Sequence, residues 1–518
     1  MVDDSRTGIL RIIWAMAAVG LAIHVAGNLT GGYGFFRDEL YFLACSDHLA
    51  AGYVDHPPLS VFILAFARLL LGNSLFAVRL TVALAGAGAI VLIGLITREL
   101  GGGRRAVFFA CLAALVSPIH LGMANIFSMN AFDILIWAAA IYVFIRLTRT
   151  GHRNDWLLLG VLLGLGLLNK TSVFWLGAGV AAAILLIAPL RRQLTTVWPY
   201  LSAAIALAIF SPFLIWNVAY DYPHLEFTRY AMGEKYASQT PWTFLTGAIL
   251  TNNLFTAPLW IGGLVFLLFG RQPDQSRRNA TRAVFVIFTT VLVILLLNFH
   301  TKAEYLAPAM SAVFAGGGLA VERLLAGRWG KWAASVYAVL ILFGGIIGAP
   351  FVLPILPVDS YVAYANSLGM RPSTAEGKEL ADLPQFYADM FGWEEKAEAV
   401  ARVFGTLHLD ERSKCAIYAE NYGRCGAIDY FGPRYGLPRS IGGHNSYWLW
   451  GPRDYTGELV IVLGGDLEDL KAAFQSVELA GVSACRHCMP YENNLPIYIC
   501  RHSKRPLKQL WPSTKSYG

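Results

Sequence analysis

The sequence predicts an all-α polytopic membrane domain of about eleven transmembrane helices, followed by a small soluble α/β domain. The mean hydropathy is +0.50 and only 14% of the residues are charged, against about a quarter in soluble domains. Apolar runs recur as far as residue 353, many of them close to the length of about 20 residues with which a helix crosses a bilayer. After residue 353 the composition becomes polar, which indicates a second kind of domain.

Eleven apolar ranges are predicted to span the membrane. They are 9–29, 79–100, 106–122, 130–148, 155–171, 172–190, 197–216, 246–270, 282–299, 305–322 and 332–353. The first range follows basic residues as a signal peptide would, but no small-residue cleavage site comes after it, so we expect an uncleaved span. The range 57–72 is short and begins with two prolines, and we expect it to be an interfacial helix.

Arginine and lysine residues accumulate in every second loop between these spans. The loops after the second, fourth, sixth, eighth and tenth spans carry most of them. By the positive-inside rule these loops and the N-terminus face the cytoplasm. The net charge of +7 is accounted for in this way, and it does not indicate a nucleic-acid partner. We therefore predict a membrane domain over 1–353 with a large outer loop over 30–78, and an extracytoplasmic domain over 354–518.

The region 354–518 has the pattern of a soluble α/β domain. Strand-like runs occur at 415–419, 459–463 and 497–500, and helix-like runs at 391–407 and 467–474. Cys485 and Cys488 could be a redox or zinc pair, although structural disulfides are the simpler interpretation in an outward domain. The pairing of the cysteines stays open. The aromatic run 447–450 could offer a surface for sugars or form part of a packed core.

Unusual polar residues fall at the outward ends of the predicted spans. They are Asp38, Glu39, Asp55 and His56 in the first outer loop, Asn130 and Asp133 near the fourth span, Lys170 after the fifth, His224 in the loop 217–245, and Lys302, Glu304 and Tyr305 before the tenth. Ionisable residues at the hydrocarbon edge are costly and usually functional. Simpler roles remain open: the two lysines could reach for the interface, Asp133 could cap a helix, and His56 could be a turn residue.

Asp38 lies with a second carboxylate in an apolar, aromatic loop, where a charge without a purpose is expensive. Such a carboxylate suits group transfer from a lipid-linked phosphate to a hydroxyl. The phosphate leaves readily once a cation holds its charge, and the hydroxyl needs a base. A single attack at a sugar carbon would invert its configuration.

The motifs resemble a known family. The segment FRDELYF at 36–42, followed by DHPPLS at 55–60, is similar to the first outer loop of the GT-C glycosyltransferases. These include glycosyltransferase family 39, with the dolichyl-phosphate-mannose protein mannosyltransferases, and the bacterial aminoarabinose transferases of lipid A. The segments SMNAFDILIWAAAIY at 128–142 and HTKAEYLAPA at 300–309 also match family patterns. The segments 421–438 and 442–452 resemble the outer domain of a bacterial branch.

The resemblance implies a bacterial inner-membrane enzyme that transfers a sugar from a polyprenyl-phosphate donor to a hydroxyl on the outer face. The acceptor could be a lipid, a polysaccharide or a protein. Asp38 would be the catalytic acid of the family, Glu39 would complete the acidic pair, and Asp133 would be a second functional acid. Donor or phosphate contacts would fall to Asp55, His56, Lys170, Lys302 and Tyr305.

Two points in this assignment are open. Some relatives have lysine where this chain has His56, so Lys170 or Lys302 would carry more of the phosphate charge. A divalent metal is possible but not settled by the resemblance.

The alternative function is a transporter or flippase of a lipid-linked saccharide, which would need polar groups and broken helices at the membrane midplane. The middle of the predicted spans is largely apolar, which argues against this alternative.

Overall fold

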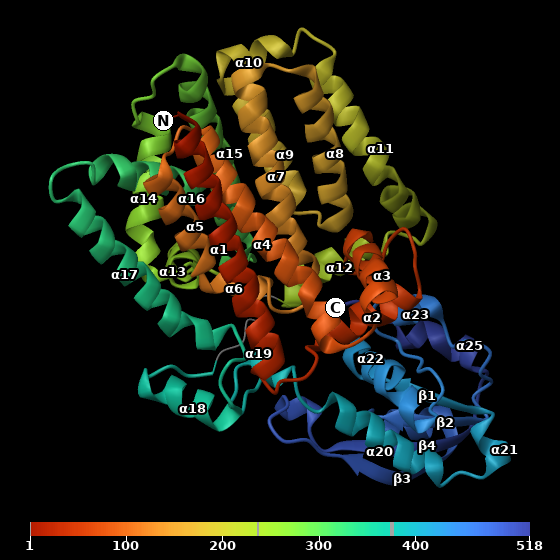
Figure 1. Ribbon diagram of the computed structural model, residues 1–518. Helices are drawn as coiled ribbons and strands as arrows, with labels where there is room; N and C mark the ends of the chain where they lie inside the picture. Colours follow the sequence, from red (N-terminus) through yellow and green to blue (C-terminus); the bar gives the residue numbers. More distant parts are fainter. Residues whose placement is uncertain (1, 236–237, 373–377) are drawn as a thin grey trace.

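The computed structural model describes residues 2–235, 238–372 and 378–518. A bundle of helices occupies the chain up to residue 353, and a small sheet with its own helices lies at one end of that bundle (Figure 1). We call residues 354–518 the sheet domain, and the end of the bundle that it covers the sheet end.

Each of the eleven predicted spans overlaps a helix of the bundle. These helices are α1 (Val2–Thr30), α4 (Leu75–Glu99), α5 (Arg104–Leu115), α7 (Met129–Thr150), α8 (Arg153–Asn169), α9 (Val173–Leu186), α11 (Trp198–Ala219), α14 (Ala257–Phe269), α15 (Gln275–Leu297), α16 (Ala307–Leu324) and α17 (Gly330–Gly348). In the described residues, six helices are long and apolar enough to cross a membrane, or seven if a bent pair counts as one span. The count of eleven therefore stays a prediction.

Two predicted spans are interrupted. The range 246–270 is not one straight helix, because α13 (Pro241–Thr251) and the segment from Leu254 meet at 99°. Asn253 makes this bend: it has a left-handed φ of 73° and its side chain caps the next turn by accepting from the N–H of Phe255 at 3.1 Å. The range 106–122 is divided because α5 ends at Leu115 and α6 (Pro118–Met123) begins with a proline.

Helix α16 is the centre of the bundle. Its residues from Ala307 to Val321 are all buried, and it packs against α4, α5, α7, α14 and α15. The close approach depends on small residues. A Cβ at Gly318 would lie 2.2 Å from the carbonyl oxygen of Ala106, and one at Gly317 would lie 2.5 Å from that of Leu259. Glycine at these positions lets backbones touch.

Several basic loops predicted to share one side of the membrane meet at the end of the bundle opposite the sheet domain. Arg149 donates to the carbonyl oxygen of Glu99 at 3.0 Å and pairs with its carboxylate. Arg323 donates to the carbonyl oxygen of Arg271. The loops after α4 and α7 therefore lie side by side, and so do the loops after α14 and α16, as the charge pattern predicts.

The sheet domain is built on four strands in the order β1-β2-β4-β3. Strands β1 (Cys415–Ala419) and β2 (Leu459–Leu463) are parallel, and β4 (Leu495–Ser503) runs antiparallel between β2 and β3 (Phe474–Ser483). The predicted runs 415–419 and 459–463 are confirmed as strands, and 497–500 lies within β4. β3 is an addition that the sequence analysis missed. Helix α20 (Trp393–Gly405), in the predicted range 391–407, packs against β2 and β3.

The sheet domain and the first loop share one core. Helix α2 (Arg37–Asp47) packs along α22 (Tyr422–Phe431), and a single cluster of buried side chains joins α2 to α20, α22 and the strands. The helices approach closely because a Cβ at Gly426 would lie 2.9 Å from the carbonyl oxygen of Leu40. Helix α3 (Leu59–Leu71), the predicted interfacial helix, follows α2 and exposes apolar side chains such as Phe66 and Leu69.

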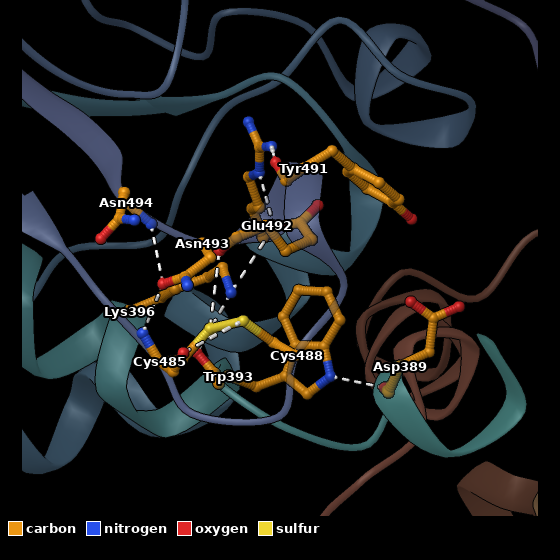
Figure 2. Close-up of a disulfide and its surroundings, with 11 residues drawn as sticks. Asp389, Trp393, Lys396, Cys485, Cys488, Tyr491, Glu492, Asn493 and Asn494 are labelled. Atoms are coloured by element: carbon orange, nitrogen blue, oxygen red, sulfur yellow. Dashed lines mark hydrogen bonds and ion pairs between the residues drawn. A yellow bond between two sulfur atoms is a disulfide. The ribbon is translucent and has the colours of Figure 1, made fainter. Parts of the chain in front are cut away.

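One disulfide closes a short loop between β3 and β4. It joins Cys485 and Cys488, beside the buried side chains of Lys396 and Glu492 (Figure 2). Both sulfurs are bonded to each other in this state, so they are not zinc ligands here. The remaining five cysteines are buried and unpaired. In the aromatic run 447–450, Tyr447 is 1% exposed and donates to Asp429 at 2.9 Å, so this tyrosine belongs to the core.

Candidate active site

A cavity of about 680 Å³ lies at the sheet end of the bundle, within the size range of small-ligand sites. Its walls come from the starts of α2 and α7, from α6, from the turn before α16, and from α18 (Val358–Ser367) and α19 (Gln385–Ala388). The charged residues that line it are Arg37, Asp38, Lys302, Glu304, Arg371 and Asp382. Two of the predicted site residues, Asp38 and Lys302, are thus on one cavity despite their distance in sequence.

Asp38 stands in the first turn of α2 with its side chain 40% exposed. Its Oδ1 accepts a hydrogen bond of 2.8 Å from the hydroxyl of Tyr422 and lies 3.6 Å from Nε of Arg37. Oδ2 has no hydrogen-bond partner among the residues that the structure describes. One carboxylate oxygen is therefore held, and the other is available to a ligand.

Glu39 lies behind Asp38 and is fully buried. Its carboxylate accepts from the backbone N–H of Phe36 and of Phe127, each at 2.8 Å. It also pairs with Arg79, whose Nη2 lies 2.9 Å from Oε2 and whose Nε lies 3.0 Å from Oε1. With four donors on two oxygens, Glu39 fixes the start of α2 against α4. It does not line the cavity.

Asp133 is in the second turn of α7 and is 1% exposed. The cap of α7 is Ser128, which accepts from the N–H of Asn130, so Asp133 does not have the capping role left open by the sequence. Its Oδ2 accepts from the hydroxyl of Ser172 at 2.8 Å and lies 4.0 Å from Nζ of Lys170.

Lys170 points inward and does not reach for the lipid interface. Its Nζ donates to Oδ1 of Asn130 at 2.7 Å and lies 5.1 Å from the centre of the Tyr305 ring. Asn130 lines the cavity. The predicted residues Lys170, Tyr305 and Asp133 therefore form a layer directly behind the cavity wall that Asn130 and Lys302 provide.

Asp55 and His56 form a second group, and neither lines the cavity. The hydroxyl of Tyr41 donates to Asp55 at 3.0 Å. His56 is 1% exposed, stacks on the ring of Phe42 at 4.5 Å and lies 3.9 Å from Asp55. His224 is hydrogen-bonded to the backbone of Val54 at 3.1 Å, and burial lowers its pKa.

Tyr422 lies between Asp38 and the group formed by Asp55 and His56. Its ring packs against Tyr41 at 4.7 Å and below the guanidinium of Arg37 at 5.4 Å, while its hydroxyl reaches Asp38. Tyr422 could not be predicted from the sequence, because no spacing relates positions that are 384 residues apart. Arg79 was not predicted as a site residue either, although it is one of few cations near an outward end of the predicted spans.

No three His, Cys, Asp or Glu side chains gather in a possible metal site within the described ranges. Asp38 and Glu39 are neighbours in sequence, but the Glu39 carboxylate already accepts hydrogen bonds from four protein donor atoms. Glu39 is therefore not available beside Asp38 as a metal ligand, and we assign no divalent cation to the cavity.

A helical membrane bundle with an acid on a cavity, capped by a sheet domain, defines the class: this is an integral membrane protein with a GT-C fold. Its backbone is similar over 95% of its length to the structure of ArnT from Cupriavidus metallidurans in the apo state, covering 98% of that chain with a TM-score of 0.59 and 15% identity. The structure of the same ArnT bound to undecaprenyl phosphate matches with a TM-score of 0.58, 14% identity and the same coverage.

Comparisons of sequence agree with the fold. A family model described as dolichyl-phosphate-mannose-protein mannosyltransferase matches residues 55–216. The chain is 26% identical over 308 residues to the lipid A galacturonosyltransferase RgtD of Rhizobium johnstonii, covering 57% of this chain and 62% of RgtD. It is 23% identical to undecaprenyl phosphate-alpha-4-amino-4-deoxy-L-arabinose arabinosyl transferase 1 of Pseudomonas fluorescens, covering 57% of this chain and 55% of that protein.

These matches confirm the resemblance to the GT-C glycosyltransferases that the motifs predict. The chain spans less than two thirds of the two curated relatives, 62% of RgtD and 55% of the arabinosyl transferase.

Proposed function

We propose that this protein is a glycosyltransferase of the bacterial inner membrane. It moves a sugar from a polyprenyl-phosphate donor to a hydroxyl acceptor on the outer face, with Asp38 as the general base. The observation that carries the proposal is that Asp38, only one of whose carboxylate oxygens is held by Tyr422, lines the same cavity as Lys302. A base and a cation on one cavity are what transfer from a phosphate ester needs.

Asp38 and Lys302 supply the base and the cation for a single displacement at the sugar. Oδ2 of Asp38 takes the proton of the acceptor hydroxyl while the hydroxyl oxygen forms a bond to the anomeric carbon of the donor. The bond from this carbon to the phosphate oxygen breaks, and the polyprenyl phosphate leaves with the electron pair. Attack and departure on opposite faces invert the anomeric centre.

The cations have different positions and therefore different proposed roles. Lys302 lines the cavity and can neutralise the leaving phosphate. Lys170 is bonded to Asn130 and stands behind the wall, where it offsets the charge of Asp133. Asp55 and His56 lie outside the cavity lining, and a contact with the donor remains a prediction for them.

The relatives narrow the choice of substrates. RgtD is a galacturonosyltransferase of lipid A, and the second relative transfers aminoarabinose from undecaprenyl phosphate, as its name states. We infer a lipid acceptor of the lipid A class and a donor of the undecaprenyl-phosphate class. The donor sugar is a hexuronic acid or an amino pentose, and the assay must offer both.

The test is transfer by the full chain in lipid vesicles. Lipid A is the acceptor, and undecaprenyl phosphate esterified with galacturonic acid or with 4-amino-4-deoxy-arabinose is the donor; products are followed by mass spectrometry. The Asp38→Asn variant should lose transfer by about 10²- to 10⁴-fold, the usual contribution of a general base. The matched control is Asp47→Asn, on the same helix, because Asp47 pairs with Arg68 and Arg439 and does not line the cavity.

Transfer of either sugar by the wild type, lost in Asp38→Asn and kept in Asp47→Asn, supports the proposal. Movement of the lipid-linked sugar across the bilayer with no transferred product would instead establish the flippase alternative.

A further inference from the structure

A side chain of the sheet domain donates a hydrogen bond to Asp38, the proposed catalytic base. The first turn of α22 brings Tyr422 against Asp38, and the hydroxyl donates to Oδ1 at 2.8 Å. Tyr422 is 7% exposed and does not line the cavity. It therefore contacts the base from behind, away from the space in which a substrate would lie.

We propose that Tyr422 is a positioning residue for Asp38, an inference that rests on the proposed function. Its hydrogen bond holds Oδ1 and leaves Oδ2 directed to the acceptor hydroxyl. Without it, the carboxylate would turn toward Arg37, whose Nε lies 3.6 Å from Oδ1. An ion pair with Arg37 through both oxygens would take away the free acceptor that the reaction needs.

The Tyr422 hydroxyl is suited to holding Oδ1 of Asp38 because it stays protonated and so remains a hydrogen-bond donor. Burial and the neighbouring carboxylates of Asp38 and Asp55 keep the pKa of Tyr422 well above its usual value, although the charge of Arg37 acts in the opposite direction. The hydroxyl stays protonated throughout the neutral and mildly alkaline range. The ring is fixed independently by Tyr41 on one face and by the guanidinium of Arg37.

The backbone that carries Tyr422 is also held firmly. Asn421 caps α22 by accepting from the N–H of Arg424 at 2.9 Å, and donates to Oε1 of Glu492 at 2.8 Å. Glu492 is 1% exposed and accepts from Nε of Arg424 at 2.9 Å. A Cβ at Gly423 would lie 2.5 Å from Cγ of Arg37, so the first turn of α22 sits directly on the residue before Asp38. The base is therefore oriented only when the sheet domain is docked.

The experiment compares Tyr422→Phe with Tyr430→Phe in the vesicle assay. Tyr430 is on the same helix, and its hydroxyl donates to the backbone of Asn73, so its loss tests general damage to α22. Tyr422→Phe should lower kcat by about 10- to 100-fold, the effect of one hydrogen bond to a charged group, with the KM for the donor unchanged. Tyr430→Phe should behave as the wild type.

Repeating the Tyr422→Phe substitution in the Asp38→Asn variant distinguishes an effect on the orientation of Asp38 from an effect on folding. In Asp38→Asn there is no base to orient, so adding Tyr422→Phe should change the residual single-turnover rate by less than about twofold. An equal fall in both backgrounds would mean a structural role and would overturn the inference. A wild-type rate for Tyr422→Phe would overturn it as well, while leaving the proposed function intact. Absence of transfer by the wild type would instead defeat the proposed function itself.

Discussion

Replacing Arg79 with methionine removes one partner of a buried ion pair. Arg79 is 1% exposed and Glu39 is fully buried, and three hydrogen bonds join them, at 2.9, 3.0 and 3.3 Å. Methionine fills most of the volume of the lost side chain but leaves the carboxylate without its countercharge. The variant therefore isolates the cost of an unpaired buried charge next to Asp38.

The expected cost follows from what remains around Glu39. Breaking a buried pair by removing one partner costs about 3–5 kcal/mol. Two backbone donors, from Phe36 and Phe127, still contact the carboxylate at 2.8 Å, so we expect the lower limit of about 3 kcal/mol. This corresponds to a fall of roughly 6–12 °C in the unfolding temperature of a domain of about 150–250 residues, and to a smaller fall of a few degrees in this longer helical bundle.

The assay is thermal unfolding of the purified protein in detergent. Arg434→Met is the matched control, because Arg434 pairs with Glu394 on the surface with both side chains largely exposed, and such pairs contribute about 0–1 kcal/mol. The double variant Glu39→Gln, Arg79→Met has no buried charge at this site and should recover part of the loss. Equal unfolding temperatures for Arg79→Met and Arg434→Met would refute the argument that this pair anchors α2.

Two further predictions concern the sheet domain. Replacing Cys485 and Cys488 with serine opens a loop of sequence separation 3. For so short a loop, the lost chain entropy of the unfolded state corresponds to about 2 kcal/mol of stability. The unfolding temperature should therefore fall by several degrees, and an unchanged temperature would contradict this value. Gly426→Leu should push α22 away from α2, because its Cβ would lie 2.9 Å from the Leu40 carbonyl, and should make the sheet domain more sensitive to proteolysis. Gly405→Leu is the control, because no atom lies within contact distance of a Cβ at this position. Equal digestion of both variants would argue against a core shared by α2 and α22.

Sequence patterns were most informative where the physical signal is local. Continuous apolar runs indicated the helices of the bundle, because a membrane helix must be apolar along its whole length. The runs 415–419 and 459–463 were found for a related reason: β1 and β2 are buried along nearly their entire length. β3 was missed because it is largely exposed: only its two end residues, Phe474 and Ser483, are buried, so it has no apolar run.

The arrangement of the site depends on contacts that a linear pattern does not contain. Asp38 and Lys302 were found as candidates from their chemistry alone, and their common cavity follows from the fold. The pairing of Glu39 with Arg79 and of Asp38 with Tyr422 joins distant segments, which no spacing rule predicts. The bend at Asn253 was hidden in the same way, because the residues on both sides of it are apolar and read as one span.

A single-turnover measurement with excess protein shows whether Asp38 acts as the base at the cavity. Donor binding and sugar transfer are measured separately on the wild type and on Asp38→Asn in the same vesicles. If Asp38 is the base, the Asp38→Asn variant should bind the donor with an unchanged Kd and transfer the sugar about 10²-fold more slowly or worse. Transfer by Asp38→Asn at the wild-type rate, with donor binding intact, would contradict it.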